Sequence, residues 1–263
     1  MRNNSVIFSD IPSPFKIFPN IIPGVHRIST EIRNLGLTCQ VIHHFSEFTN
    51  AELVTVLTKL VSNETLIVGF STNFWGHAPE PGILKIIKPV SLIIEWLTQH
   101  CPNIKIIFGG ASARIAFEHP FKKIDAIFEG FSDAGLKKYV ESIRDSVEEP
   151  TPNEFINDIK VYRSENNPDN FDFNTSKITF HADDHIQFGS TSVIETARGC
   201  IFKCKFCAFP LNGKDKFDYI KDAETLRDEL IDNYEKYGIQ YYILADDTFN
   251  DSTFKVELLH KVF

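Results

Sequence analysis

The chain has 263 residues, and its 43% hydrophobic and 13% aromatic content is enough to fill the cores of two domains. A formal net charge of −8 argues against a surface made for nonspecific nucleic-acid binding, although Lys203, Lys205, Lys214 and Lys216 can form a local basic rim. There is no basic-then-apolar leader and no run of about 18 apolar residues, since charges and a proline interrupt the most apolar stretch, residues 83–97. These features predict a globular, cytoplasmic protein without a membrane span.

Short apolar runs alternate with amphipathic segments in residues 1–146. Strict alternation of strand and helix predicts an α/β fold with a doubly wound parallel sheet, of flavodoxin or Rossmann type, that helices cover on both faces. We therefore expect residues 1–146 to form one domain. The predicted strands are residues 5–9, 38–43, 66–70, 104–108 and 126–128, and the predicted helices are residues 25–35, 50–61, 83–99 and 133–146.

Ligands of such sheets bind outside the carboxyl ends of the strands. Ser71, Gly109 and Gly110 stand at these ends, which makes them candidate binding residues. The paired glycines let a backbone approach a ligand closely, or they only permit a tight turn into the next helix. The sequence is compatible with both interpretations.

Turn-forming residues replace the apolar periodicity in residues 147–176, which predicts a linker. An edge strand is expected at residues 177–181. Residues 147–189 are thus the predicted linker and edge segment between two domains.

The last part of the chain, residues 190–263, predicts strand-helix units of a β/α barrel. A strand at residues 192–194 is followed by a helix that begins near Asp222, whose side chain is expected to cap it, and ends at Gly238. A strand at residues 240–244 and a final helix follow. One barrel unit takes about 30 residues, so only about two units fit. We expect a fragment of a longer protein, a chain that a partner chain completes, or a decayed remnant.

Three of the five cysteines fall within eight residues, as Cys200-x3-Cys204-x2-Cys207. Three thiolates on one loop can hold a soft metal, whereas a disulfide would use two of them and leave the third over. Structural zinc is the alternative, but such sites usually have four ligands, and no second C-x2-C pair follows. A cubane iron–sulfur cluster held by three cysteines leaves one iron open to an outside molecule. Cys39 and Cys101 are expected to be small buried residues without a role.

The spacing C-x3-C-x2-C, with Phe206 before the last cysteine and Ala-Arg-Gly before the first, resembles the signature of the radical S-adenosylmethionine superfamily. The resemblance implies that Cys200, Cys204 and Cys207 bind three irons of a 4Fe-4S cluster, and that S-adenosylmethionine chelates the fourth. It implies that the reduced cluster splits S-adenosylmethionine to a 5′-deoxyadenosyl radical, which abstracts hydrogen from a substrate. It also implies that Phe206 lies near the adenine.

The strand at residues 240–244 runs into Ala245-Asp246-Asp247, where the superfamily usually has a Gly-Gly-Glu-like segment near the methionine part of the cofactor. This variant resembles one found in the cobalamin-linked subgroup. The resemblance implies that Asp246 or Asp247 pairs with the ammonium of S-adenosylmethionine. The alternative is a cap for the next helix, a role for which Asp251 is already available.

The first domain resembles the cobalamin-binding domain that precedes the barrel in one large subgroup, where a strand also runs into Gly-Gly. The Asp-x-His-x-x-Gly motif that supplies a histidine to cobalt in some of these domains is missing, because Asp10 is followed by Ile11 and Pro12. The resemblance therefore implies cobalamin bound without a histidine ligand, with Ser71, Gly109 and Gly110 as candidate contacts, or a domain kept as a scaffold. The residues expected to be ordinary polar or packing histidines are His26, His43, His44 and His77.

These expectations favour a radical S-adenosylmethionine enzyme that acts on a small molecule or another substrate, with cobalamin-linked methyl transfer as one outcome. The expected electron donor is a flavodoxin or a ferredoxin. The alternative is a noncatalytic module, in which the α/β domain binds cobalamin or a partner and the cysteine loop is a structural metal clip.

Overall fold

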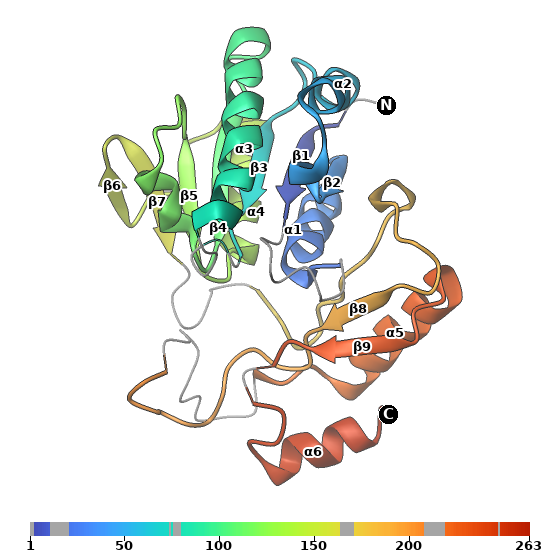
Figure 1. The fold of residues 1–263 in the computed structure, drawn as a ribbon. Coiled ribbons are helices and arrows are strands. Elements are labelled where there is room, and N and C mark those ends of the chain that lie inside the picture. Colours follow the sequence, from blue (N-terminus) through green and yellow to red (C-terminus); the bar gives the residue numbers. More distant parts are fainter. Residues whose placement is uncertain are drawn as a thin grey trace. The chain divides into compact units, whose positions relative to one another are not determined.

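The computed structural model describes residues 3–10, 21–73, 75, 80–163, 171–207, 219–246 and 248–263 (Figure 1). The chain divides into two compact units. Unit 1 consists of Met1–Phe18 and Gly24–Ser164, and unit 2 consists of Pro19–Pro23 and Glu165–Phe263.

Unit 1 is built on a sheet that has, in the described residues, seven strands in the order β2-β1-β3-β4-β5-β7-β6. All neighbouring strands are parallel except β6 and β7, which form an antiparallel pair at one edge. The strands are β1 (Ser5–Ser9), β2 (Cys39–His43), β3 (Ile67–Ser71), β4 (Lys105–Gly110), β5 (Ala126–Glu129), β6 (Glu154–Ile156) and β7 (Ile159–Arg163).

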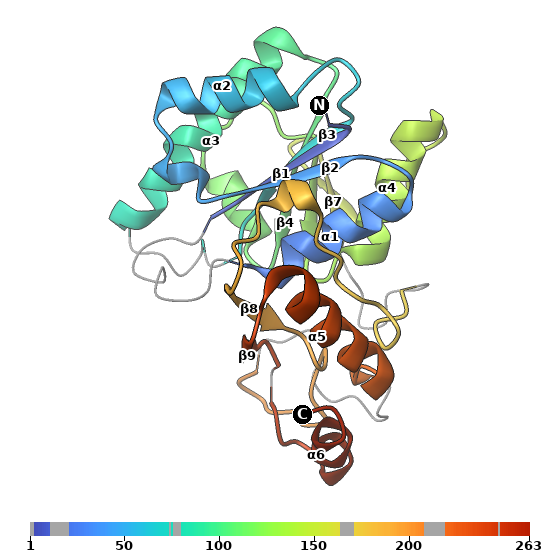
Figure 2. The ribbon, with the colours of Figure 1, turned by 90° about the vertical axis from the view of Figure 1, so that its right-hand side faces the viewer.

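Helices cover both faces of this sheet, which confirms the doubly wound α/β fold (Figure 2). On one face, aromatic side chains that include Phe8, Phe70 and Phe108 pack in a core with α2 and α3. On the other face, α4 is tied to α1, because Lys137 pairs with Glu31 over 3.1 Å. The helices of unit 1 are α1 (Pro23–Asn34), α2 (Asn50–Leu60), α3 (Glu80–His100) and α4 (Asp133–Asp145), with short 3-10 turns η2 (Phe45–Glu47) and η4 (Ala113–Glu118).

The predicted strands and helices of unit 1 are confirmed to within a few residues at their ends, because their apolar periodicity is strong. Local chemistry sets some of these ends. α2 begins with a capping box, in which Thr49 Oγ1 accepts the Glu52 N–H (3.3 Å) and the Glu52 carboxylate accepts the Thr49 N–H (2.8 Å). Neither the 21-residue α3 nor any other helix in the described residues is long and apolar enough to cross a membrane.

The prediction of a linker over residues 147–176 is wrong in part. Residues 154–163 form the hairpin of β6 and β7, and β7 pairs in parallel with β5, so this segment extends the sheet. The turn residues Asn157 and Asp158 both have positive φ (49° and 65°), as in tight two-residue hairpins. The predicted edge strand at residues 177–181 is also wrong, since these residues are described and form no strand.

In its described residues, unit 2 has two parallel strands, β8 (Thr191–Ile194) and β9 (Tyr241–Leu244), and α5 (Ala223–Tyr237) lies between them in the chain. The other elements are α6 (Thr253–His260) and the 3-10 turn η5 (Ala182–Asp184). A small buried cluster of Ile194, Leu226 and Leu259 joins β8, α5 and α6. This is the strand-helix arrangement that the sequence predicts for the segment.

The two ends of α5 differ in how well they match the prediction. Gly238 ends the helix in the left-handed region (φ 63°), as expected. Asp222 stands at the N-cap position, but its side chain accepts no hydrogen bond from the helix, so the predicted side-chain cap is wrong. Its backbone N–H instead donates to the Asn174 carbonyl (3.0 Å).

Candidate functional site

The candidate binding residues of unit 1 lie in one row at the carboxyl ends of the strands. Ser9 of β1 lies between His43 of β2 and Ser71 of β3, and Ser71 lies beside Gly109 of β4. The Ser9 hydroxyl is buried and has no hydrogen-bond partner among the described residues. The structure thus brings Ser71 and Gly109 together at the edge where ligands of doubly wound sheets bind.

Gly110 follows this row with a φ of +119°, where side chains are rarely accepted. A Cβ at this position would stand 2.6 Å from Asn73 Oδ1, and the Ala111 N–H donates to the same oxygen (3.4 Å). Thr72 ties the same strand ends together, because its N–H and its hydroxyl both donate to the Gly109 carbonyl (2.9 and 3.0 Å). A tight turn therefore requires glycine at 110, and the close approach of this backbone to a ligand stays a prediction.

Two histidines of unit 1 contact each other beside this row. His26 of α1 is fully buried, and its Nε2 lies 2.9 Å from His43 Nε2. One of the two nitrogens carries the hydrogen and donates the hydrogen bond, and the other accepts it. The sequence predicts that both are ordinary polar or packing residues, and the structure adds that they hydrogen-bond to one another.

The cysteine loop of unit 2 begins soon after β8. Cys200 is buried at 6% exposure, whereas Cys204 is exposed and Cys207 is half-buried. The Cys200 thiol accepts the Phe202 N–H (3.5 Å), and the Cys207 N–H donates to the Cys204 carbonyl (3.0 Å). In the part of the chain that the structure describes, no three histidine, cysteine or carboxylate side chains are grouped closely enough to hold a metal ion.

The donor set of the loop nevertheless fits a soft metal. Residues 200–207 offer three thiols and no carboxylate or imidazole. Thiolates are the ligands that iron–sulfur clusters and zinc prefer, and they are poor ligands for magnesium or calcium. Two of the three thiols are accessible from solvent, so a metal can reach them.

Asp246, at the end of β9, holds the chain between β8 and Cys200. Its side chain is 1% exposed, and Oδ1 accepts the N–H groups of Thr196 (2.9 Å) and Ala197 (3.2 Å). Oδ2 accepts the Thr196 hydroxyl and lies 2.8 Å from Nζ of the fully buried Lys255. Both oxygens therefore have partners within the chain, and the pairing of Asp246 or Asp247 with an ammonium stays a prediction.

Asp251 binds the residue that follows Cys200, whereas Asp246 binds residues that precede it. Its Oδ2 accepts the Tyr219 hydroxyl (2.7 Å) and the Ile201 N–H (3.4 Å). Burial, and then the hydrogen bond to this carboxylate, raise the pKa of the Tyr219 phenol. The assignment of Asp251 as a helix cap is wrong, because Ser252 caps α6 by accepting the Lys255 N–H (3.2 Å).

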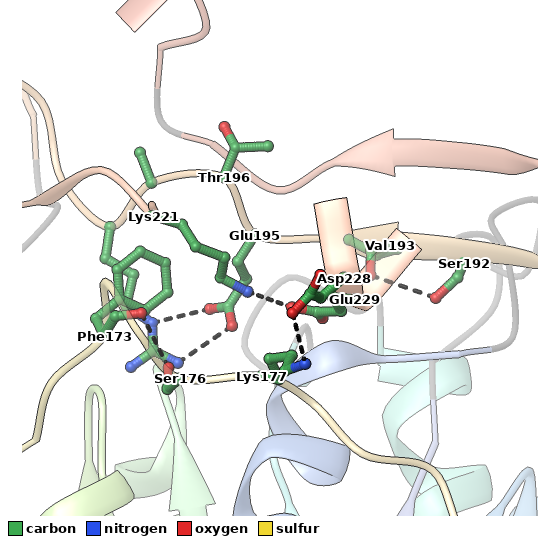
Figure 3. Close-up of polar contacts among 12 residues, drawn as sticks. Phe173, Ser176, Lys177, Ser192, Val193, Glu195, Thr196, Lys221, Asp228 and Glu229 are labelled. Atoms are coloured by element: carbon green, nitrogen blue, oxygen red, sulfur yellow. Dashed lines mark hydrogen bonds and ion pairs between the residues drawn. The ribbon is translucent and has the colours of Figure 1, made fainter. Parts of the chain in front are cut away.

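Two buried ion pairs lie in unit 2 near the start of the cysteine loop (Figure 3). Arg198 Nε donates to Glu195 Oε1 (2.9 Å), and Lys221 pairs with Glu229, the latter two side chains being 0% and 3% exposed. The Phe173 ring lies 4.9 Å from the Arg198 guanidinium and 5.6 Å from the Lys221 ammonium, as in cation–π contacts. The first pair could have been predicted, because Glu195 and Arg198 carry opposite charges three residues apart in the sequence. No comparable sequence pattern predicts the pairing of Lys221 with Glu229.

The remaining predicted residues are exposed, buried in unit 1 or outside the described residues. Phe206 is 91% exposed, so its place near an adenine stays a prediction. Asp247 lies outside the described residues, as do Lys214, Lys216 and His77. Lys203 and Lys205 are exposed on the cysteine loop, and Cys39 and Cys101 are buried in unit 1.

Comparisons with models of protein families and with curated proteins find no match for this chain. Among solved structures, the chain is similar to TsrM from Kitasatospora setae, a radical S-adenosylmethionine methyltransferase determined with a tryptophan substrate and the analogue aza-SAM bound. The TM-score is 0.68 at 14% identity, over 98% of this chain and 50% of TsrM. The chain shares the fold of this radical S-adenosylmethionine enzyme.

Two further structures agree. TsrM with cobalamin and a [4Fe-4S] cluster bound gives a TM-score of 0.65 at 13% identity, over 98% of this chain and 50% of that one. The cobalamin-dependent S-adenosylmethionine radical enzyme OxsB, without ligands, gives 0.66 at 15% identity, over 98% of this chain and 36% of OxsB. The chain therefore spans about half the length of TsrM and about a third of the length of OxsB. At these sequence identities, the likeness establishes the fold alone.

Proposed function

We propose that this chain binds a 4Fe-4S cluster through Cys200, Cys204 and Cys207 and takes part in the reductive cleavage of S-adenosylmethionine. The observation that carries the proposal is a C-x3-C-x2-C loop directly after β8 in a chain with the fold of TsrM and OxsB. When bound, such a cluster supplies the electron that splits S-adenosylmethionine into methionine and a 5′-deoxyadenosyl radical. A flavodoxin or a ferredoxin is the proposed electron donor, and methyl transfer to a small molecule or another acceptor is the proposed outcome.

The side chains around the loop are assigned as follows. Phe206, which the structure leaves exposed, is proposed to cover the adenine. We assign the ammonium of S-adenosylmethionine to Asp247 rather than Asp246, because both oxygens of Asp246 are occupied by Thr196, Ala197 and Lys255.

We further propose that unit 1 binds cobalamin at the carboxyl ends of its strands, with Ser71, Gly109 and Gly110 as contacts. No histidine is expected to bind the cobalt, because the Asp-x-His-x-x-Gly motif is missing. Two histidines beside these strand ends, His26 and His43, hydrogen-bond to one another through Nε2. Cobinamide lacks the nitrogenous base of cobalamin, so any nitrogen splitting in the electron paramagnetic resonance spectrum of its bound cobalt(II) form must come from the protein. We expect binding without that splitting, and a protein-derived splitting contradicts the proposal.

Anaerobic reconstitution of the full chain with iron and sulfide tests the cluster. We expect about four irons and four sulfides per chain, as a cubane requires, a brown absorbance, and dithionite-dependent release of 5′-deoxyadenosine or methionine from S-adenosylmethionine. Cys204→Ala should lose the iron, the absorbance and the cleavage together.

The matched control is Cys101→Ala, which removes a buried thiol of unit 1 and should retain the iron. One tightly bound zinc and no labile sulfide in the purified protein contradicts the proposed cluster. Zinc that survives in the wild type but not in Cys204→Ala would identify the loop as a structural metal clip.

A further inference from the structure

Two buried carboxylates hold the chain on both sides of Cys200. Asp246 accepts the N–H groups of Thr196 and Ala197, and Asp251 accepts the N–H group of Ile201. Both aspartates belong to the connection between β9 and α6, about 50 residues further along the chain. Backbone N–H groups on both sides of Cys200 are therefore held by a segment that contributes no cysteine.

Each carboxylate is itself held by a second buried group. Lys255 is 0% exposed, pairs with Asp246 over 2.8 Å, and donates to the Thr248 carbonyl (2.6 Å). Tyr219 is 1% exposed and donates to Asp251 over 2.7 Å. The same connection also contacts the thiol, since Thr248 Oγ1 lies 3.5 Å from Cys200 Sγ.

We propose that Asp246 and Asp251, with Lys255 and Tyr219 as their partners, position Cys200 for cluster binding. This set of four residues is called the aspartate clamp. The inference rests on the proposed function, and it makes the four side chains positioning residues that act through the loop backbone. Cys200 is the buried thiol of the three, so it serves as the fixed ligand toward which the accessible Cys204 and Cys207 close.

The two aspartates use their oxygens differently, which gives the test its selectivity. Asp246 uses both oxygens, so an amide at this position must turn its NH2 group toward N–H donors or toward Lys255. Asp251 uses only Oδ2, and its buried Oδ1 has no partner among the described residues. An asparagine at 251 can therefore keep both hydrogen bonds with its oxygen, whereas an asparagine at 246 cannot.

The first measurement needs no cluster. In the reduced, iron-free full chain, maleimide labelling is followed by mass spectrometry at Cys200 and, as an internal reference, at the exposed Cys204. Asp251→Ala and Tyr219→Phe each remove hydrogen bonds of the clamp, so we expect Cys200 to react about tenfold faster with Cys204 unchanged. Asp251→Asn should react like the wild type, and so should Asp232→Asn, which alters an exposed ion pair on α5.

The second measurement uses the reconstituted protein. We expect Asp251→Ala to release its iron to a chelator about tenfold faster than the wild type, with altered g-values of the reduced cluster, and Asp251→Asn to restore both. Asp246→Asn leaves Lys255 buried without its charge partner and can fail to fold. The double variant Asp246→Asn/Lys255→Met removes both charges, so its circular dichroism should match the wild type while its iron is released faster.

The outcomes separate the two proposals. If the wild type binds no iron but Cys200 labelling follows the expected order, the cluster proposal fails, and the four residues are shown to hold Cys200 without a role in cluster binding. If the wild type binds four irons but the clamp variants keep the wild-type labelling rate, release rate and g-values, the clamp is overturned. Faster labelling of Cys204 in step with Cys200 also overturns it, since that result reports general unfolding of unit 2.

Discussion

The buried pair of Lys221 and Glu229 gives a sharp test of what holds unit 2 together. Both side chains are almost fully removed from water, at 0% and 3% exposure, and each is the ion-pair partner of the other. Lys221→Met leaves Glu229 as a buried charge without this partner, which typically costs about 3–5 kcal/mol. A domain of this size is stable by about 5–15 kcal/mol, so the loss is a large fraction of the total.

Hydrogen exchange measured by mass spectrometry can follow unit 2 alone. The two tryptophans, Trp75 and Trp96, belong to unit 1, so tryptophan fluorescence does not report unit 2. A loss of about 3 kcal/mol corresponds to exchange about 100-fold faster in peptides that cover β8 and β9. The double variant Lys221→Met/Glu229→Leu removes both charges and should exchange within about tenfold of the wild type.

A matched control is Lys236→Met, which removes the exposed partner of Asp232 on the same helix. Exposed pairs contribute about 0–1 kcal/mol, so this variant should exchange nearly like the wild type. The reasoning is refuted if Lys221→Met exchanges at the wild-type rate, or if the double variant exchanges as fast as the single one. The second result would mean that packing, rather than charge pairing, sets the cost.

Unit 1 offers two further predictions, both measured by urea unfolding followed through tryptophan fluorescence. Gly110→Ala should lower the free energy of unfolding by about 1–3 kcal/mol, because φ is +119° at this position and the added Cβ would meet Asn73. Gly135→Ala in α4 should raise the free energy of unfolding by about 0.5–1 kcal/mol, because there is open space around this helical glycine. Equal effects of the two would contradict this account. Tyr139→Phe should stabilise unit 1 by about 1 kcal/mol, because the buried hydroxyl has no partner among the described residues, and Tyr162→Phe should destabilise it by about 1 kcal/mol, because Tyr162 donates to the Pro150 carbonyl (3.1 Å). Burial raises the pKa of Tyr162 to about 12, whereas the phenol of the unfolded chain has a pKa near 10. The neutral phenol therefore contributes fully to the free energy of unfolding below about pH 10, and this contribution is lost as the pH rises to about 12. Tyr162→Phe should make that loss smaller, and an unchanged pH profile would show that other groups cause it.

Local sequence patterns were enough to predict the strands and helices of residues 1–146 and the position of the cysteine loop. A short apolar run such as residues 66–70 is stable only when it is buried, which predicts a core strand. Apolar residues three or four positions apart predict the helices that cover the sheet. The cysteine spacing is a covalent property of the chain, and it places three soft ligands within one loop before any folding is considered. Gly238 is similar, because the end of a helix favours glycine for local backbone reasons.

The burial of particular polar residues, and the partners that they contact, could be learned only from the folded structure. The strands β6 and β7 are short and follow a turn-rich segment. β7 joins the sheet only because β5, which forms elsewhere in the chain, offers it an edge. Charged side chains are usually exposed. The structure nevertheless buries the side chains of Lys221, Glu229, Asp246 and Lys255. Their burial is tolerated because each side chain pairs with an opposite charge, Lys221 with Glu229 and Asp246 with Lys255, and the partners are in contact only in the folded chain.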